Sequence, residues 1–236
     1  MELEKHKKEI FDFLKDLVII AVIVIFLRTF VAEPFQISGQ SMASSYYNQE
    51  FIIVDRFSYL DIPLIKVWKI NMWDVIVFKP GVSEEKKYFI KRVIWVGGDT
   101  IRIKAWDVFI KQAWKKDFVK LDEWYLNKDN KWNTKISYSM KEYNFLVPEG
   151  EYFVMWDNRN NSSDSRTCFD NNCGISKVDS FIEKDEIIGK VFIDLGYFNF
   201  WNFSFTNPWK HWYPEIKWLD TTPKWFSSQS TYDYKL

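Results

Sequence analysis

The stretch YFIKRVIWVGGDTIRIKAWDVFIK, residues 88–111, decides the fold. It contains three short runs rich in branched and aromatic residues, and a cluster of turn residues, Gly97-Gly98-Asp99, separates the first run from the second. Runs of this length and composition, bounded by turn signals, are typical of β-strands. The connections are too short for crossover helices, so they favour antiparallel sheets over alternating βα units. The three expected strands are Tyr88–Val96, Thr100–Ile103 and Val108–Lys111.

The same pattern continues on both sides and predicts an all-β domain over residues 32–195. Residues 111–140, rich in Lys, Asp and Asn, are interpreted as a solvated excursion between strands. Residues 196–236 are interpreted as a peripheral aromatic segment and a loose tail. The further expected strands are Phe51–Val54, Val75–Phe78, Asn144–Val147, Tyr152–Met155 and Ile187–Asp194.

An apolar segment near the N-terminus predicts a membrane anchor. Leu17–Leu27 carries no charge, and a helix over residues 13–31 would be about 28 Å long, close to the roughly 30 Å hydrocarbon core of a bilayer. The lysines upstream place residues 1–12 in the cytoplasm and the following domain on the exported side. A cleavable signal peptide and a buried or interfacial helix are the alternatives.

Composition excludes several classes of function. Lys+Arg and Asp+Glu both number 32, which gives no electrostatic argument for nucleic acid. Histidine occurs only at positions 6 and 211, which argues against a Ser-His triad or a His-built metal site inside the domain. Two cysteines cannot provide four zinc ligands. We therefore expect no metal and no cofactor.

Four segments, in chain order, carry the chemistry. They are EPFQISGQSM (33–42), DVIVF (74–78), YFIKRVI followed by GGDTI (88–94 and 97–101), and DNRNNSSDSR (157–166). These segments resemble the conserved boxes of bacterial type I signal peptidases, and the resemblance covers residues 11–195. It implies a signal peptidase-like fold and a single-pass plasma-membrane serine endopeptidase. Such an enzyme cleaves signal peptides from secretory preproteins after small residues at −3 and −1, without an obligate oligomer.

The resemblance implies Ser41 as nucleophile, Lys91 as general base and Ser162 as the residue that orients Lys91. A serine hydroxyl needs a base to remove its proton, and the sequence offers no usable histidine. An exposed lysine has a pKa of about 10.4, but burial among apolar neighbours lowers it. A Ser-Lys dyad is a known variant of the catalytic triad.

Further roles follow from the same resemblance. Asp164 and Arg166 would form an ion pair that supports the site. Phe35, Ile37, Met42 and Ile90 would line shallow apolar pockets for the substrate. Ordinary core packing is the alternative, and for Phe35 and Ile90 it explains the residues equally well. The Ser41 backbone N–H would be one oxyanion donor. The second donor stays open, because Gly39 stands where some members have Ser.

The loop after Met42 departs from the family, with Ala43-Ser44-Ser45-Tyr46 in place of x-P-T-L. This departure motivates one alternative, a catalytically inactive membrane-anchored binding module. A self-cleaving repressor-type peptidase also fits the dyad, but it does not fit the anchor.

Two unusual residue types lead to separate predictions. The chain has 13 Trp and only 8 Gly, and Trp73, Trp95, Trp106 and Trp156 stand where the family has turn glycines. We predict that most of the tryptophans are glycines in the natural protein, through a UGA codon that is read as glycine in the source organism. Genuine tryptophans near a membrane are the alternative.

Separately, we expect a disulfide to join Cys168 and Cys173, which a short polar loop separates.

Overall fold

The computed structural model describes residues 2–43, 45–56, 70–81, 88–131, 134, 142–159, 163–169 and 180–206. A long helix, α1 (Glu2–Phe26), continues into a π-helical turn, η1 (Leu27–Val31). Two short 3-10 turns, η3 (Ser165–Thr167) and η4 (Lys184–Glu186), follow later. The strands are β1 (Ala32–Gln36), β2 (Phe51–Asp55), β3 (Val75–Phe78), β4 (Phe89–Val96), β5 (Thr100–Lys104), β6 (Asp107–Lys111), β7 (Val119–Lys120), β8 (Glu142–Leu146), β9 (Tyr152–Met155), β10 (Ile187–Asn199) and β11 (Ser204–Thr206).

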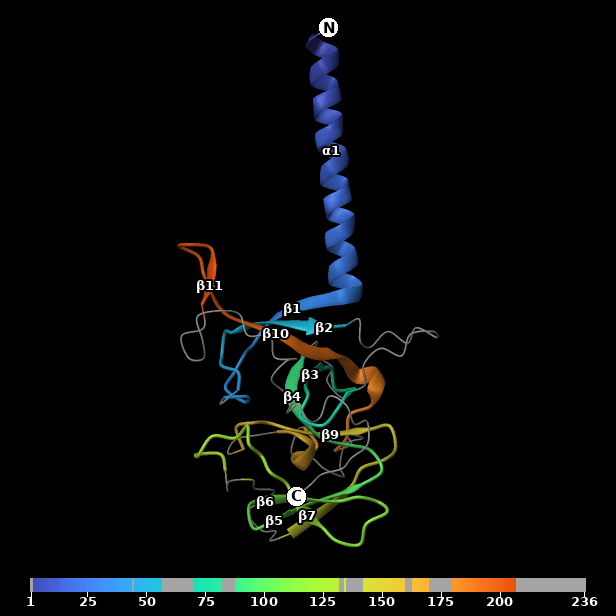
Figure 1. Cartoon of the computed structure of the whole chain (residues 1–236), viewed down its shortest axis with the longest axis vertical. Helices are drawn as coiled ribbons and strands as arrows, with labels where there is room; N and C mark the ends of the chain where they lie inside the picture. The colour runs from blue at the N-terminus through green and yellow to red at the C-terminus, as the bar shows by residue number, and fades with distance from the viewer. Residues whose placement is uncertain are drawn as a thin grey trace.

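Within the described residues the strands form two antiparallel sheets. One has seven strands in the order β1-β2-β10-β3-β4-β9, with β11 paired to β10, and the other has four in the order β7-β6-β5-β8. The seven-stranded sheet lies nearer to α1 and the four-stranded sheet at the far end of the molecule (Figure 1). The predicted all-β antiparallel architecture is confirmed. Every expected strand is found within two residues at each end, except that the last one continues from Asp194 to Asn199.

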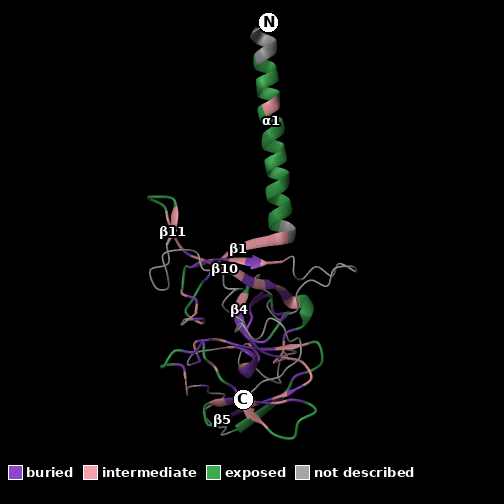
Figure 2. Cartoon of the chain, in the orientation of Figure 1, coloured by how far each residue is buried: buried purple, intermediate pink, exposed green. Residues whose placement is uncertain are grey.

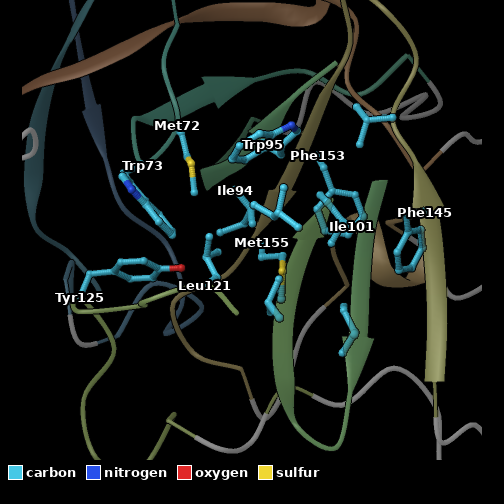
Figure 3. Close-up of a cluster of buried hydrophobic side chains, with 14 of the residues drawn as sticks. Met72, Trp73, Ile94, Trp95, Ile101, Leu121, Tyr125, Phe145, Phe153 and Met155 are labelled. Atoms are coloured by element: carbon cyan, nitrogen blue, oxygen red, sulfur yellow. The ribbon is translucent and has the colours of Figure 1, made fainter. Parts of the chain in front are cut away.

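Three buried clusters fill the domain, and the largest lies between the two sheets (Figure 3). This cluster includes Leu121, Tyr125 and Leu126, and the Tyr125 ring packs on Trp73 with centroids 5.1 Å apart. The interpretation of residues 111–140 as a solvated excursion is therefore wrong for this part. The side chains of Leu121, Tyr125 and Leu126 are covered because β7 pairs with β6 and leads the chain back across the core.

Helix α1 carries an apolar surface that nothing in the described chain covers. Its large hydrophobic side chains from Ile10 to Phe26 are 49–68% exposed, and the helix stands clear of the domain (Figure 2). None of the helices in the described ranges has the length and apolar character needed to cross a membrane. The predicted single N-terminal helix is thus present, while the span over residues 13–31 is not confirmed.

Two of the four tryptophans at turn positions have a backbone conformation that favours glycine. The φ angles of Trp73 and Trp106 are +73° and +76°. Large L side chains are rare in this region because Cβ approaches the neighbouring carbonyl group. This geometry supports glycine at both positions. Trp95, in contrast, is buried and donates a 2.8 Å hydrogen bond from Nε1 to Asp99, so its indole is accommodated.

We expect Trp106→Gly to stabilise the protein by about 1 kcal/mol, because it removes the left-handed strain at a half-exposed position. The matched control is Trp114→Gly, also in an exposed turn but without positive φ, which should be neutral or destabilising. Denaturant unfolding of both variants measures the difference. Equal effects would contradict the strain argument, and peptide mass spectrometry of the natural protein would show directly which residue stands at position 106.

Cys168 is disulfide-bonded, as expected. The chain has one other cysteine, Cys173, which lies outside the described residues. Cys168 is the residue directly after η3, with a φ of +51°. Its disulfide bond therefore begins next to the segment 163–167.

Candidate active site

Lys91 lies on β4, between β3 and the edge strand β9 of the seven-stranded sheet, and its side chain is buried. It pairs with Ile76 of β3 and is 1% exposed. Nζ donates a 3.0 Å hydrogen bond to the Ile90 carbonyl and lies 4.8 Å from the Phe89 ring centroid and 4.4 Å from that of Trp156. Burial lowers the pKa of Lys91 to about 7, although the negative charge of Asp164 acts in the opposite direction. Near neutral pH a large share of this amine is therefore unprotonated and able to accept a proton.

The next residue, Arg92, has the opposite electrostatic environment. Nε and Nη2 donate to both carboxylate oxygens of Asp157 at 2.8 and 2.7 Å. The same guanidinium donates to the Trp73 carbonyl at 2.8 Å and to Ser45 Oγ at 3.0 Å. Burial opposes the charged form, but Asp157 outweighs it and raises the pKa of Arg92. Arg92 is thus a fixed cation that ties β4 to the segments around Ser41 and Asp157.

Ser41 lies in a turn beyond β1, and hydrogen bonds from Asn158 hold that turn. The Asn158 backbone N–H donates to the Ser41 carbonyl at 2.9 Å, and its Nδ2 donates to the Gln40 carbonyl at 3.1 Å. Just before the turn, Gly39 has a φ of +100°, and its N–H donates to Asn48 Oδ1 at 2.8 Å. The first and fourth sequence boxes are therefore in direct contact. Sequence reasoning missed the part played by Asn158, for which its position in the fourth box was the only signal.

The Asp164–Arg166 ion pair expected from the sequence is present and buried. Arg166 Nη2 lies 2.8 Å from Asp164 Oδ2, and the carboxylate also accepts the Trp156 N–H at 3.2 Å. Burial favours the neutral acid, but Arg166 outweighs it and lowers the pKa of Asp164. Asp164 therefore stays ionised close to Lys91. Ser162, the third expected catalytic residue, lies outside the described residues.

The four residues expected to line substrate pockets belong to one apolar cluster. Phe35 and Ile90 are partly buried at its edge, whereas Ile37 and Met42 are 5% and 0% exposed. In this structure Ile37 and Met42 pack as core residues, and Phe35 and Ile90 keep exposed surface that a peptide could contact. Tyr88 was not anticipated. It is 49% exposed, and its ring packs edge-on against Phe35 at 5.3 Å.

The fold thus brings the separate sequence boxes together without joining the two expected dyad residues directly. Among the described residues, Lys91 Nζ donates to the Ile90 carbonyl and no hydrogen bond links it to the Ser41 side chain. Nor do the described residues include a group of three or more His, Cys, Asp or Glu side chains placed to hold a metal ion. What the arrangement offers is a buried amine with a lowered pKa at Lys91, next in sequence to Arg92, whose guanidinium donates a hydrogen bond to Ser45 in the loop after Ser41.

Comparisons with known proteins point in one direction. Residues 10–195 match the family model for signal peptidase, peptidase S26. Signal peptidase I P of Bacillus subtilis subsp. natto is 30% identical over 187 residues, which cover 78% of this chain and 92% of that protein. Signal peptidase I of Pseudomonas fluorescens is 32% identical over 213 residues, covering 80% and 74%. A solved signal peptidase I from Enterococcus faecalis shares 24% identity, covers 52% of this chain and 97% of that chain, and has a TM-score of 0.37.

Proposed function

The chain belongs to the signal peptidase family, peptidase S26, and from that premise we propose that Ser41 and Lys91 form its catalytic dyad. Members of this family are serine endopeptidases, so a serine must attack the scissile carbonyl. The observation that carries the proposal is the buried position of Lys91, where the pKa of its amine is lowered to about 7. No histidine lies between positions 6 and 211 to take the same role.

The reaction follows from these two groups. The neutral amine of Lys91 removes the proton of Ser41 as its Oγ bonds to the substrate carbonyl carbon. The resulting ammonium then gives its proton to the leaving amine, and the peptide bond breaks to leave an acyl-serine. Lys91 next takes a proton from water, whose oxygen attacks the ester carbonyl. As the bond from that carbonyl to Ser41 Oγ breaks, the Lys91 ammonium returns the proton to Oγ and the neutral amine is restored. The N–H of Ser41 stabilises the oxyanion in both steps, and Ser162 orients the Lys91 amine.

We place the substrate, the signal peptide of a secretory preprotein, in an extended conformation beside Phe35 and Ile90. An extended chain presents alternate side chains on the same side, so positions −1 and −3 would enter neighbouring apolar pockets. The partly exposed surfaces of Phe35 and Ile90 support this placement. Pockets this shallow would favour small residues such as Ala.

Lipid is the proposed environment of α1. Its apolar side chains lie open over most of the helix length, which is unfavourable in water. Lys5, Lys7 and Lys8 at its start favour a cytoplasmic N-terminus, which would put the β domain on the exported side of the plasma membrane.

Acylation of Ser41 tests the proposed function most directly. An activated ester of a peptide ending in Ala-x-Ala should leave its acyl group on Ser41, as found by peptide mass spectrometry. Ser38→Ala, three residues earlier, should still be acylated, whereas Ser41→Ala should not. If the peptide bound without acylating the protein, a binding module would be the better interpretation.

The pH dependence of cleavage reports the protonation state of Lys91. Since only the neutral amine accepts a proton, kcat/KM should rise with pH through about 7, the pKa of Lys91 in the fold. Asp164 raises that pKa, so Asp164→Asn should move the acidic limb of the profile to lower pH. The measurement is kcat/KM for a peptide substrate from pH 5 to 10. A limb near pH 10, as for an exposed lysine, would contradict the buried base.

A further inference from the structure

One residue of the segment that follows β7, Tyr125, contacts two of the buried arginines of the site. Tyr125 is 8% exposed, and its ring lies beside Trp73 in the cluster between the sheets (Figure 3). The guanidinium carbon of Arg92 lies 4.3 Å from the centre of this ring. Nη2 of Arg159 donates a 2.9 Å hydrogen bond to the hydroxyl group. Tyr125 therefore links the third sequence box, which contains Arg92, to the fourth, which contains Arg159.

The Tyr125 hydroxyl belongs to a closed hydrogen-bonded network of three side chains. It donates a 2.7 Å hydrogen bond to Glu123 Oε1, and the same carboxylate accepts a hydrogen bond from Arg159 Nη2. Burial and the nearby Glu123 carboxylate raise the pKa of Tyr125, so the hydroxyl keeps its proton and acts as the donor. Each of the three groups is thus bonded to the other two. A buried polar network linked in this way holds its members in one arrangement.

Two further residues after β7 hold Arg159 in place. Asn130 Oδ1 accepts the Arg159 backbone N–H at 2.9 Å, and Thr134 Oγ1 accepts a hydrogen bond from Nη1 at 3.1 Å. The Asn130 side chain is itself oriented by a 2.9 Å hydrogen bond from its Nδ2 to Asn127 Oδ1. Arg159 is 1% exposed, and a buried cation without partners is strongly unfavourable. The position of Arg159 is therefore set by residues that lie 25 to 36 positions earlier in the chain.

The position of Arg159 matters because it fixes one side of Asn158. The Asn158 N–H donates to the Ser41 carbonyl at 2.9 Å and so holds the turn of the expected nucleophile. On the other side, Asp157 is fixed by two hydrogen bonds from Arg92. Asn158 therefore lies between two anchored residues, and the tyrosine contacts the arginine of each anchor.

We propose that Tyr125 and Glu123 are positioning residues of the peptidase, acting through Arg159 and Asn158 on the turn that carries Ser41. This inference rests on the proposed role of Ser41 as the nucleophile. The two residues supply no group to the reaction, and their effect comes from keeping the serine hydroxyl in the geometry of attack. A displacement of about 1 Å can cost roughly 10²-fold in rate. None of the contacts that carry the inference uses a tryptophan side chain, so they do not depend on the residue at position 73.

Acylation of Ser41 by the activated ester tests the positioning role on the full chain. Tyr125→Phe removes the hydroxyl and keeps the ring, whereas Glu123→Gln removes the charge and keeps the shape of the side chain. In single-turnover measurements each variant should lower the maximal acylation rate by roughly tenfold or more, with little change in the ester concentration at half of that rate. The matched controls are Tyr143→Phe in β8 and Asp122→Asn, both at exposed positions, which should keep the parent rate.

Hydrogen exchange of the Asn158 backbone N–H gives a second measurement that does not depend on activity. This group donates to the Ser41 carbonyl, so its exchange should quicken severalfold in Tyr125→Phe. Exchange in β5, which belongs to the other sheet, should stay unchanged. An equal increase in both places would mean that the variant only lowers the stability of the whole domain, and it would overturn the proposal.

Parent-like acylation in Tyr125→Phe, or unchanged exchange at Asn158, would also overturn it. Tyr125→Phe decides alone if Glu123→Gln does not fold, because it keeps the ion pair between Glu123 and Arg159. If the parent protein is not acylated, the proposed function fails, whereas the exchange measurement still shows whether Tyr125 holds the Ser41 turn.

Discussion

Lys91→Ala is expected to lower kcat/KM for preprotein cleavage by at least about 10³-fold, because a buried general base has no substitute in this site. The apolar replacement places no charged group at position 91 and opens only a small cavity, so the fold should be retained. Circular dichroism and denaturant unfolding verify this before activity is compared. Ser41→Ala should cause a loss of similar size, and the double variant should lose no more than either single one, since the two residues act as one unit.

A matched control separates the role of Lys91 from the general effect of removing a strand lysine. Lys104 of β5 is exposed and forms a 3.1 Å ion pair with Glu142 of β8. Both residues belong to the four-stranded sheet, which does not contain Lys91. Lys104→Ala should change neither cleavage nor stability by more than a small factor. Near-normal turnover of Lys91→Ala would mean that another group acts as the base.

Strand positions were predictable because turn residues separate short apolar runs, and the structure departs from the prediction where that signal is weak. Strand β1 is not among the expected strands. It contains Pro34, which is tolerated because β1 is an edge strand in the described sheet. The run expected to end at Asp194 continues as β10 to Asn199. Its aromatic continuation was interpreted as the start of a peripheral segment, but it extends the strand and β11 pairs with it.

The candidate site was predictable by residue type and less so by contact. Burial of Lys91 follows from the apolar residues around it in β4. The partners of Arg92 cannot be predicted from the neighbouring sequence, because Asp157 lies 65 residues away and only the fold brings the two residues together. For the same reason the sequence could not show that Asn158 holds the Ser41 turn. Local sequence pattern indicates a secondary-structure element and the chemistry of its side chains, whereas long-range pairing is a property of the folded chain.

The second large effect concerns stability. Arg92→Ala should lower the free energy of unfolding by about 3–5 kcal/mol, because it leaves the buried carboxylate of Asp157 without its cation. The same change removes the hydrogen bonds from Arg92 to Ser45 and to the Trp73 carbonyl, so the loop after Ser41 should be held less firmly and cleavage should fall as well. Urea unfolding at fixed pH gives the stability difference.

The control is Arg102→Ala, also a strand arginine, whose ion pair with Glu142 at 3.0 Å is partly exposed. Such a pair contributes about 0–1 kcal/mol to the free energy of unfolding. Arg92→Ala should therefore lower that free energy severalfold more than Arg102→Ala. Replacing both partners, Arg92→Met with Asp157→Leu, removes the unpaired charge and should recover much of the stability lost in Arg92→Ala. Cleavage should not recover to the same extent, because the hydrogen bond from Arg92 to Ser45 remains absent. Equal destabilisation by Arg92→Ala and Arg102→Ala would show that the buried pair is not what fastens β4 to the serine loop.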